Sequence, residues 1–210
     1  MAKSSLSFLS PILCQLGEFG EAENLLRESL AVSRDIDDQW GVPICLNHLG
    51  TVATMQGKYA EARQCHLESA ALLKDMGDRG QMAIALCHLG EASYALGAFD
   101  EAEQAFYEAL RLAHEIQAVP VELDVLVGLA AIMRQAGEKP GRVCELLGLI
   151  QHHPASTGAA KDRAKHLLAE LEPRFPAQAR AARERAPART FEAIVEELLR
   201  APQEHRIVAD

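Results

Sequence analysis

Histidine and cysteine side chains at matched spacing are the residues of this sequence that could bind a metal ion. His48 and His88 are 40 residues apart, and Cys45 and Cys87 stand close to them in the chain. A histidine pair could hold a metal or respond to protons, but zinc takes three or four protein ligands. The alternative is that these side chains line one face of a helix as ordinary polar residues. We therefore predict neither a metal site nor a cofactor.

Motifs for covalent or phosphate chemistry are missing from the sequence. No serine has the GxSxG context of a hydrolase, and neither GxxxxGK[ST] nor GxGxxG occurs. The recurring carboxylates Glu61, Glu101 and Glu103 fit solvated helix faces better than acid–base pairs. We expect a protein that is not an enzyme.

Charge and hydropathy narrow the range of partners. The 210 residues include 21 basic and 30 acidic side chains, a formal net charge of -9. An acidic chain repels phosphate backbones, so we expect no direct binding to nucleic acid. The five cysteines form no CxxC pair and fit reduced thiols, and no run of ~18 apolar residues could span a membrane. We expect a soluble, cytoplasmic protein.

The elements that position these residues follow from an internal repeat. Segments that begin LGTVATMQG at Leu49 and LGEASYALG at Leu89 align at an offset of 40 residues. The same spacing relates glycines, alanines and aromatic residues along the chain. These are Gly17, Gly57, Gly97 and Gly137, then Ala22, Ala62 and Ala102, then Phe19, Tyr59 and Phe99. Such agreement predicts a series of similar structural units.

Each unit is predicted to be a pair of helices. Apolar residues between positions 44 and 53 recur at steps of three and four, which is the helical period. Gly57 ends this helix, because glycine suits the left-handed conformation of a helix cap. A small residue such as Gly50 lets two helices cross closely. A second helix starts near Tyr59 and carries on one face the apolar residues Ala62, Leu67, Ala70 and Leu73.

The pattern LG, six residues, then G-x-aromatic-x-E-A resembles the tetratricopeptide repeat family, in a variant with a period of 40 residues. The resemblance implies an all-α, right-handed α-solenoid of antiparallel helix pairs, in which stacking buries the faces that no pair buries alone. About four repeats fill residues 1–153. The outer two are irregular, with Ser10 and Pro11 in the first and Ala130 in the fourth.

Residues 154–210 leave this register and are predicted to form C-terminal capping helices and a tail. Helices are expected over 161–171 and 176–186, each bounded by a proline. A third helix opens at Phe191 with Thr190 as its N-cap.

The segment from LLGLIQHHPAS to FEAIVEELL resembles the C-terminal end of large bacterial regulators of the STAND or LuxR type. In those proteins a nucleotide-binding switch is followed by tetratricopeptide repeats. The resemblance implies that the chain is the sensor or scaffold part of a longer signalling or transcription-regulating protein.

The family resemblance also implies a concave groove that binds a peptide or protein. Carried over by register, the first helix of each repeat supplies its lining. The candidate partner-binding residues are Asn47, Thr51, Thr54, Met55, Cys87, Glu91, Tyr94, Asp124, Val127 and Arg134. Met55, Tyr94 and Arg134 are the expected anchors, since aromatic residues and arginine are frequent at interfaces.

Two other functions remain open at this stage. Solenoid ends could stack between copies, which would make the chain a self-associating structural module and a homo-oligomer. A metal-dependent regulator or enzyme that uses the histidines is the third hypothesis. Fold alone does not choose between them.

Overall fold

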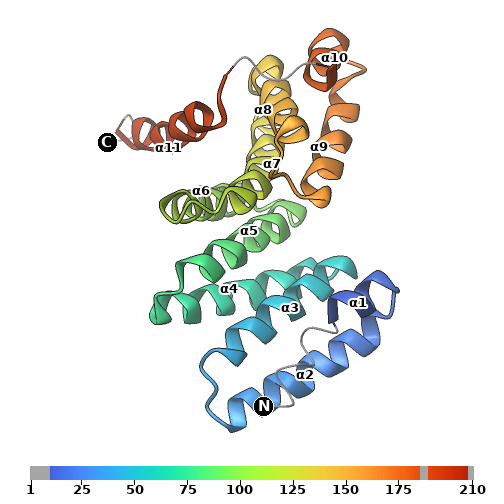
Figure 1. Ribbon diagram of the computed structural model, residues 1–210, viewed down its shortest axis with the longest axis vertical. Helices are drawn as coiled ribbons and strands as arrows, with labels where there is room; N and C mark the ends of the chain where they lie inside the picture. Colours follow the sequence, from blue (N-terminus) through green and yellow to red (C-terminus); the bar gives the residue numbers. More distant parts are fainter. Residues whose placement is uncertain (1–9, 185–188, 208–210) are drawn as a thin grey trace. The chain divides into compact units, whose positions relative to one another are not determined.

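The computed structural model describes residues 10–184 and 189–207, and within these residues it consists of helices joined by short turns (Figure 1). The helices are α1 (Ser10–Gln15), α2 (Phe19–Asp35), α3 (Gly41–Met55), α4 (Tyr59–Met76), α5 (Arg79–Ala95), α6 (Phe99–Glu115), α7 (Val119–Gln135), α8 (Pro140–His152), α9 (Gly158–Leu171), α10 (Pro176–Glu184) and α11 (Phe191–Ile207). None of these described helices is both long enough and apolar enough to cross a membrane.

The chain forms two compact units, Met1–Ala105 and Phe106–Asp210, and the boundary falls within α6. The predicted division between residues 153 and 154 is of another kind, because it separates repeats from capping helices, and it stays a prediction.

The first unit is a stack in which each helix packs on the next, α2 on α3, α3 on α4 and α4 on α5 (Figure 1). Gly57 follows the end of α3 with a φ of 74°, and its N–H donates to the carbonyl of Thr54 at 3.0 Å. This confirms the predicted glycine cap. The turns after α2 and α4, which lead from one helix pair to the next, also contain a residue with positive φ, Asp37 and Gly77 respectively. Gln117 has this role after α6.

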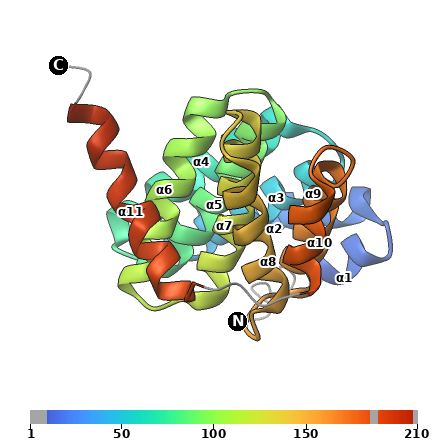
Figure 2. The ribbon, with the colours of Figure 1, turned by 90° about the horizontal axis from the view of Figure 1, so that it is seen from above.

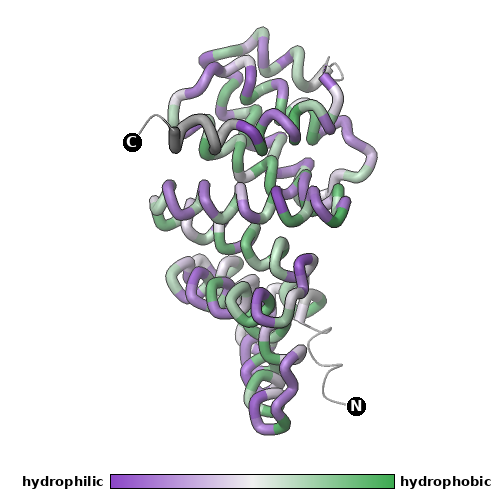
Figure 3. Tube along the Cα trace, turned by 90° about the vertical axis from the view of Figure 1, so that its left-hand side faces the viewer, coloured by the Kyte–Doolittle hydropathy of each residue, from purple (hydrophilic) through white to green (hydrophobic). Residues whose placement is uncertain are grey.

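The core of the first unit corrects one prediction about α4. Ala62, Ala70 and Leu73 are buried as expected, but Leu67 is 42% exposed. His66 is fully buried in its place. The reason is geometric, since positions 62, 66, 70 and 73 follow the three- and four-residue steps of one helix face, whereas position 67 lies beside it. Figure 3 shows hydrophilic and hydrophobic residues alternating along the helices in this way.

The second helices of successive pairs are joined by ion pairs. Arg27 contacts both Glu23 and Glu61, at 2.8 and 2.7 Å, and so links α2 to α4. Arg63 contacts Glu101 at 2.6 Å and links α4 to α6. Exposed pairs contribute only about 0–1 kcal/mol each. Their main effect is to pair the charged side chains along the second helices.

In the second unit, α9 and α10 lie beside α8 (Figures 1 and 2). The predicted helix at 161–171 begins at Gly158, because the Thr157 hydroxyl caps it by accepting from the Ala160 N–H at 3.0 Å. α10 approaches α8 so closely that a Cβ on Gly148 would lie 2.9 Å from the backbone oxygen of Ala182. The end predicted for α10, at residue 186, lies outside the described residues.

The last helix, α11, is positioned by its N-terminus. The Thr190 hydroxyl accepts from the Ala193 N–H at 3.3 Å, which confirms the predicted cap. The Phe191 ring packs against His153 at an interplanar angle of 45°, with 5.0 Å between ring centroids. Ile194, Val195 and Leu198 are buried, so the apolar face of α11 packs against the unit.

Replacing Gln117 by glycine should stabilise the protein. Gln117 has a φ of 56°, a conformation that costs an L-residue ~1–2 kcal/mol. Glycine removes this cost but loses about 0.5–1 kcal/mol to the greater freedom of the unfolded chain. We expect a net gain of about 0.5 kcal/mol, measured by urea denaturation. Gln135→Gly, at the end of α7, is the matched control and should destabilise; a gain there as well would refute the backbone explanation.

Candidate functional site

A stripe of half-exposed side chains runs along α3 and α5, the first helices of two successive pairs. These two helices contact each other within the first unit. We call the stripe the first-helix face. It comprises Ile44, Asn47, His48, Thr51, Thr54 and Met55 on α3, and Ile84, His88, Glu91 and Tyr94 on α5.

Six of the ten predicted binding residues lie on the first-helix face: Asn47, Thr51, Thr54, Met55, Glu91 and Tyr94. Two others, Cys87 and Val127, are only 3% exposed. The repeat spacing predicted the correct helix for each residue, but both side chains point into the core. They cannot contact a partner and are removed from the proposed site.

The remaining two residues, Asp124 and Arg134, are held by α9 in the second unit. Asp124 accepts a hydrogen bond from the Thr157 hydroxyl at 3.2 Å and lies 3.4 Å from Arg163. Arg134 forms an ion pair with Glu170. α9 therefore covers the α7 positions that correspond to the first-helix face, and Arg134 is a structural ion-pair residue in this unit.

The first-helix face is poor in charge. α3 contains no acidic or basic residue apart from the histidine, and α5 contributes Arg79 and Glu91. The Thr51 and Thr54 hydroxyls donate to backbone carbonyls one turn earlier, at 3.1 and 3.0 Å. Tyr94 packs edge-on against Phe99 with 5.4 Å between centroids. The face thus offers apolar and aromatic contact area with few free donors.

Beneath this face, Asn47 joins two histidines from different helices. Its side-chain oxygen lies 2.7 Å from Nδ1 of His66 and 3.3 Å from Nδ1 of His88. A carbonyl oxygen only accepts, so this arrangement places a proton on each Nδ1. The two rings are 5.1 Å apart between centroids. The histidine pair is therefore His66 and His88, and the repeat-related His48 has no part in it.

His66 also fits closely against Gly50. A Cβ on Gly50 would lie 2.6 Å from Cε1 and Nε2 of the His66 ring. Burial, followed by the nearby His88, lowers the pKa of His66 to about 3, and the Gly50 carbonyl opposes this shift only partly. His66 is neutral at physiological pH and acts as a core ring rather than as a cation. Burial likewise lowers the pKa of His48.

Sequence reasoning missed His66 although a signal was present. Position 66 corresponds to Phe106 one register later, and Phe106 is also a fully buried ring beside a glycine, Gly128. Glu122 was missed too. It is buried and pairs with His114 at 2.8 Å in the second unit, and nothing in the local sequence marks it.

Within residues 10–184 and 189–207, no three His, Cys, Asp or Glu side chains come close enough together to hold a metal ion. The cysteines at 14, 45, 65, 87 and 144 form no disulfide.

Models of the tetratricopeptide repeat family match residues 4–75 and 82–116. Among solved structures, the chain is similar to a candidate kinesin light chain from Podosopora anserina with nearly identical TPR-like repeats. That structure is 20% identical, with 98% of this chain and 99% of that chain covered and a TM-score of 0.63. A form of the same protein with one substitution is 17% identical, with 97% and 99% covered and a TM-score of 0.66. Likeness at this identity shows the α-solenoid fold alone. No curated protein matches the sequence.

The buried His66 should make stability depend on pH. Its folded pKa is about 3, whereas an unfolded histidine has a pKa of about 6.5. Below pH ~6.5 this histidine binds a proton in the unfolded chain but stays neutral in the folded chain. The free energy of unfolding therefore falls as the pH decreases, by up to about 1.4 kcal/mol per pH unit. Urea denaturation between pH 4 and 8 measures the slope. His66→Phe should flatten it, and an unchanged slope would assign it to other groups.

Gly50→Ala should destabilise the first unit. The added methyl would overlap the His66 ring, and overpacking of this kind costs about 1–3 kcal/mol. The cost should largely disappear in the His66→Ala background, where the ring is missing. A double-mutant cycle measures this coupling. Additive losses would mean that the two residues do not share one packing site.

Proposed function

The chain contains tetratricopeptide repeats, which generally mediate protein–protein interaction, and we propose that it binds a peptide or protein partner on the first-helix face. We propose no catalytic role, since scaffolds of this fold are typically non-enzymatic.

One contrast supports this choice of surface. On the second helices, Arg27, Arg34 and Arg63 are occupied by carboxylates of the neighbouring repeat. The α7 positions of the second unit are covered by α9. The α3 stripe of the first unit is half-exposed and contains no acidic or basic side chain apart from His48. Half-exposed apolar and aromatic side chains lose little free energy when a partner displaces water from them, so they are suited to binding.

The finer proposal concerns biological context. The resemblance of the C-terminal segment to bacterial nucleotide-switch regulators supports a role as the sensor or scaffold part of a cytoplasmic signalling or transcription-regulating protein. Within such a protein, a partner on the first-helix face would convey the signal.

A second candidate function is self-association through the end of the helix stack. Ile12 on α1 and Leu16 in the turn directly after it are exposed apolar side chains that favour it. Light scattering across a range of concentrations distinguishes the two functions, because a partner-binding module stays monomeric and a stacking module does not.

Peptides selected from a random display library against the chain should lose affinity for the Met55→Glu variant. Met55 is 53% exposed on α3, and a carboxylate there would place an unpaired charge in an apolar contact. We expect a loss of at least about tenfold, which corresponds to 1.4 kcal/mol. Fluorescence anisotropy of a labelled peptide measures it.

Leu67→Glu is the matched control, because Leu67 is similarly exposed but lies on α4. Peptides that lose affinity equally in both variants, or only in Leu67→Glu, would refute the first-helix face as the binding site. Unaltered circular dichroism spectra show that both variants are folded.

A further inference from the structure

The turn between α2 and α3 exposes an apolar pair. Ile36 is 68% exposed and Trp40 is 56% exposed, and Trp40 is the only tryptophan in the chain. An aromatic side chain of this size is usually buried at least in part by its own domain. We call Ile36 and Trp40, with Asp35 and Asp37 around them, the turn patch.

The carboxylates of the turn patch differ from those of the neighbouring helices. Within the described residues, Asp35 and Asp37 have no cationic partner, and the nearby Arg34 is paired with Glu68 at 3.0 Å. Asp38 accepts from the backbone N–H groups of Trp40 and Gly41 and is occupied by the turn itself. The carboxylates paired across the second helices are Glu23, Glu61, Glu68 and Glu101.

Folding does not account for these two charges. Asp35 is the last residue of α2, where the helix dipole disfavours an anion. Asp37 has a φ of 54°, which glycine adopts at lower cost. Both residues therefore work against local stability.

We infer that the turn patch binds a partner segment in which an arginine lies next to an apolar side chain. A guanidinium stacks well on an indole ring and forms paired hydrogen bonds with carboxylates. Trp40, Asp35 and Asp37 provide these groups on one turn, and Ile36 provides contact for the apolar side chain. This surface is additional to the first-helix face.

The single tryptophan makes the test direct. A short capped peptide of arginine, leucine and glycine is titrated against the whole chain while Trp40 fluorescence is followed. Analogues with lysine or glutamate in place of arginine are compared. We expect the arginine peptide to shift the emission, lysine to bind more weakly and glutamate not to bind. Raised salt should weaken binding.

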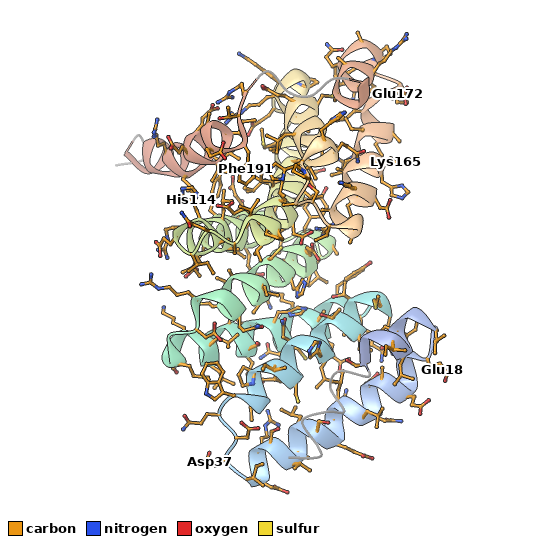
Figure 4. The ribbon with its side chains drawn as sticks, viewed as in Figure 1. Glu18, Asp37, His114, Lys165, Glu172 and Phe191 are labelled. Atoms are coloured by element: carbon orange, nitrogen blue, oxygen red, sulfur yellow. The ribbon has the colours of Figure 1, made fainter. Side chains whose placement is uncertain are left out.

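The decisive variant is Asp35→Asn/Asp37→Asn, which should weaken the arginine peptide by about tenfold or more while raising the melting temperature. Its control is Glu18→Gln/Glu21→Gln, which removes the same charge at the other end of α2, roughly 25 Å away by helix length. Figure 4 shows Glu18 and Asp37 at these opposite ends. The control should bind the peptide as the unaltered chain does.

Several results would overturn the inference. Equal weakening in both double variants would mean general attraction of a basic peptide to an acidic chain. Weakening by Met55→Glu would place the peptide on the first-helix face instead. Dimers that disappear in Trp40→Ser would make the turn patch an interface between copies. If the first-helix face fails its own test while the turn patch passes, only the earlier proposal is lost.

Discussion

Close approach of neighbouring helices, within a pair or between successive pairs, is the constraint on which the packing depends. Where α3 meets α4, Gly50 has no side chain and the His66 ring fills the space above it. In the second unit, where α6 of one pair meets α7 of the next, a Cβ on Gly128 would lie 2.3 Å from Cζ of Phe106. A ring over a glycine sets the distance between two helices. The apolar faces behind it can then be buried by the next pair.

The ring at the α3–α4 crossing is a histidine, His66, and this adds a polar requirement to the packing. A buried imidazole needs a hydrogen-bond partner, and Asn47 supplies it at 2.7 Å. The same amide reaches His88 on α5. One nitrogen of the buried ring, Nδ1, is therefore satisfied by a residue of the first-helix face, whereas Nε2 has no hydrogen-bond partner among the described residues. The packing of α3 on α4 is in this way linked to the surface formed by α3 and α5. Phe106 makes no such demand in the second unit.

Local signals explain what could be predicted from the sequence. The glycine cap at Gly57 and the cap at Thr190 depend on a few neighbouring residues, so pattern alone located them. Leu67 was assigned to the buried face of α4 although position 66, and not 67, continues the helical steps from Ala62 to Ala70. Cys87 and Val127 face the core because the rotation of α5 and α7 about their axes depends on what packs against them. The covering of Asp124 and Arg134 by α9 involves residues more than 30 positions away, which no local pattern encodes.

Covering of α7 by α9 also limits the surface left for a partner. The first-helix face comprises only α3 and α5, each roughly 22–26 Å long at 1.5 Å per residue. A peptide that crosses two helices about 10 Å apart contacts them with only a few residues. Such a contact gives modest affinity by itself. The turn patch lies in the same compact unit, so a partner that engages both surfaces would gain from effective concentration without any stronger single contact.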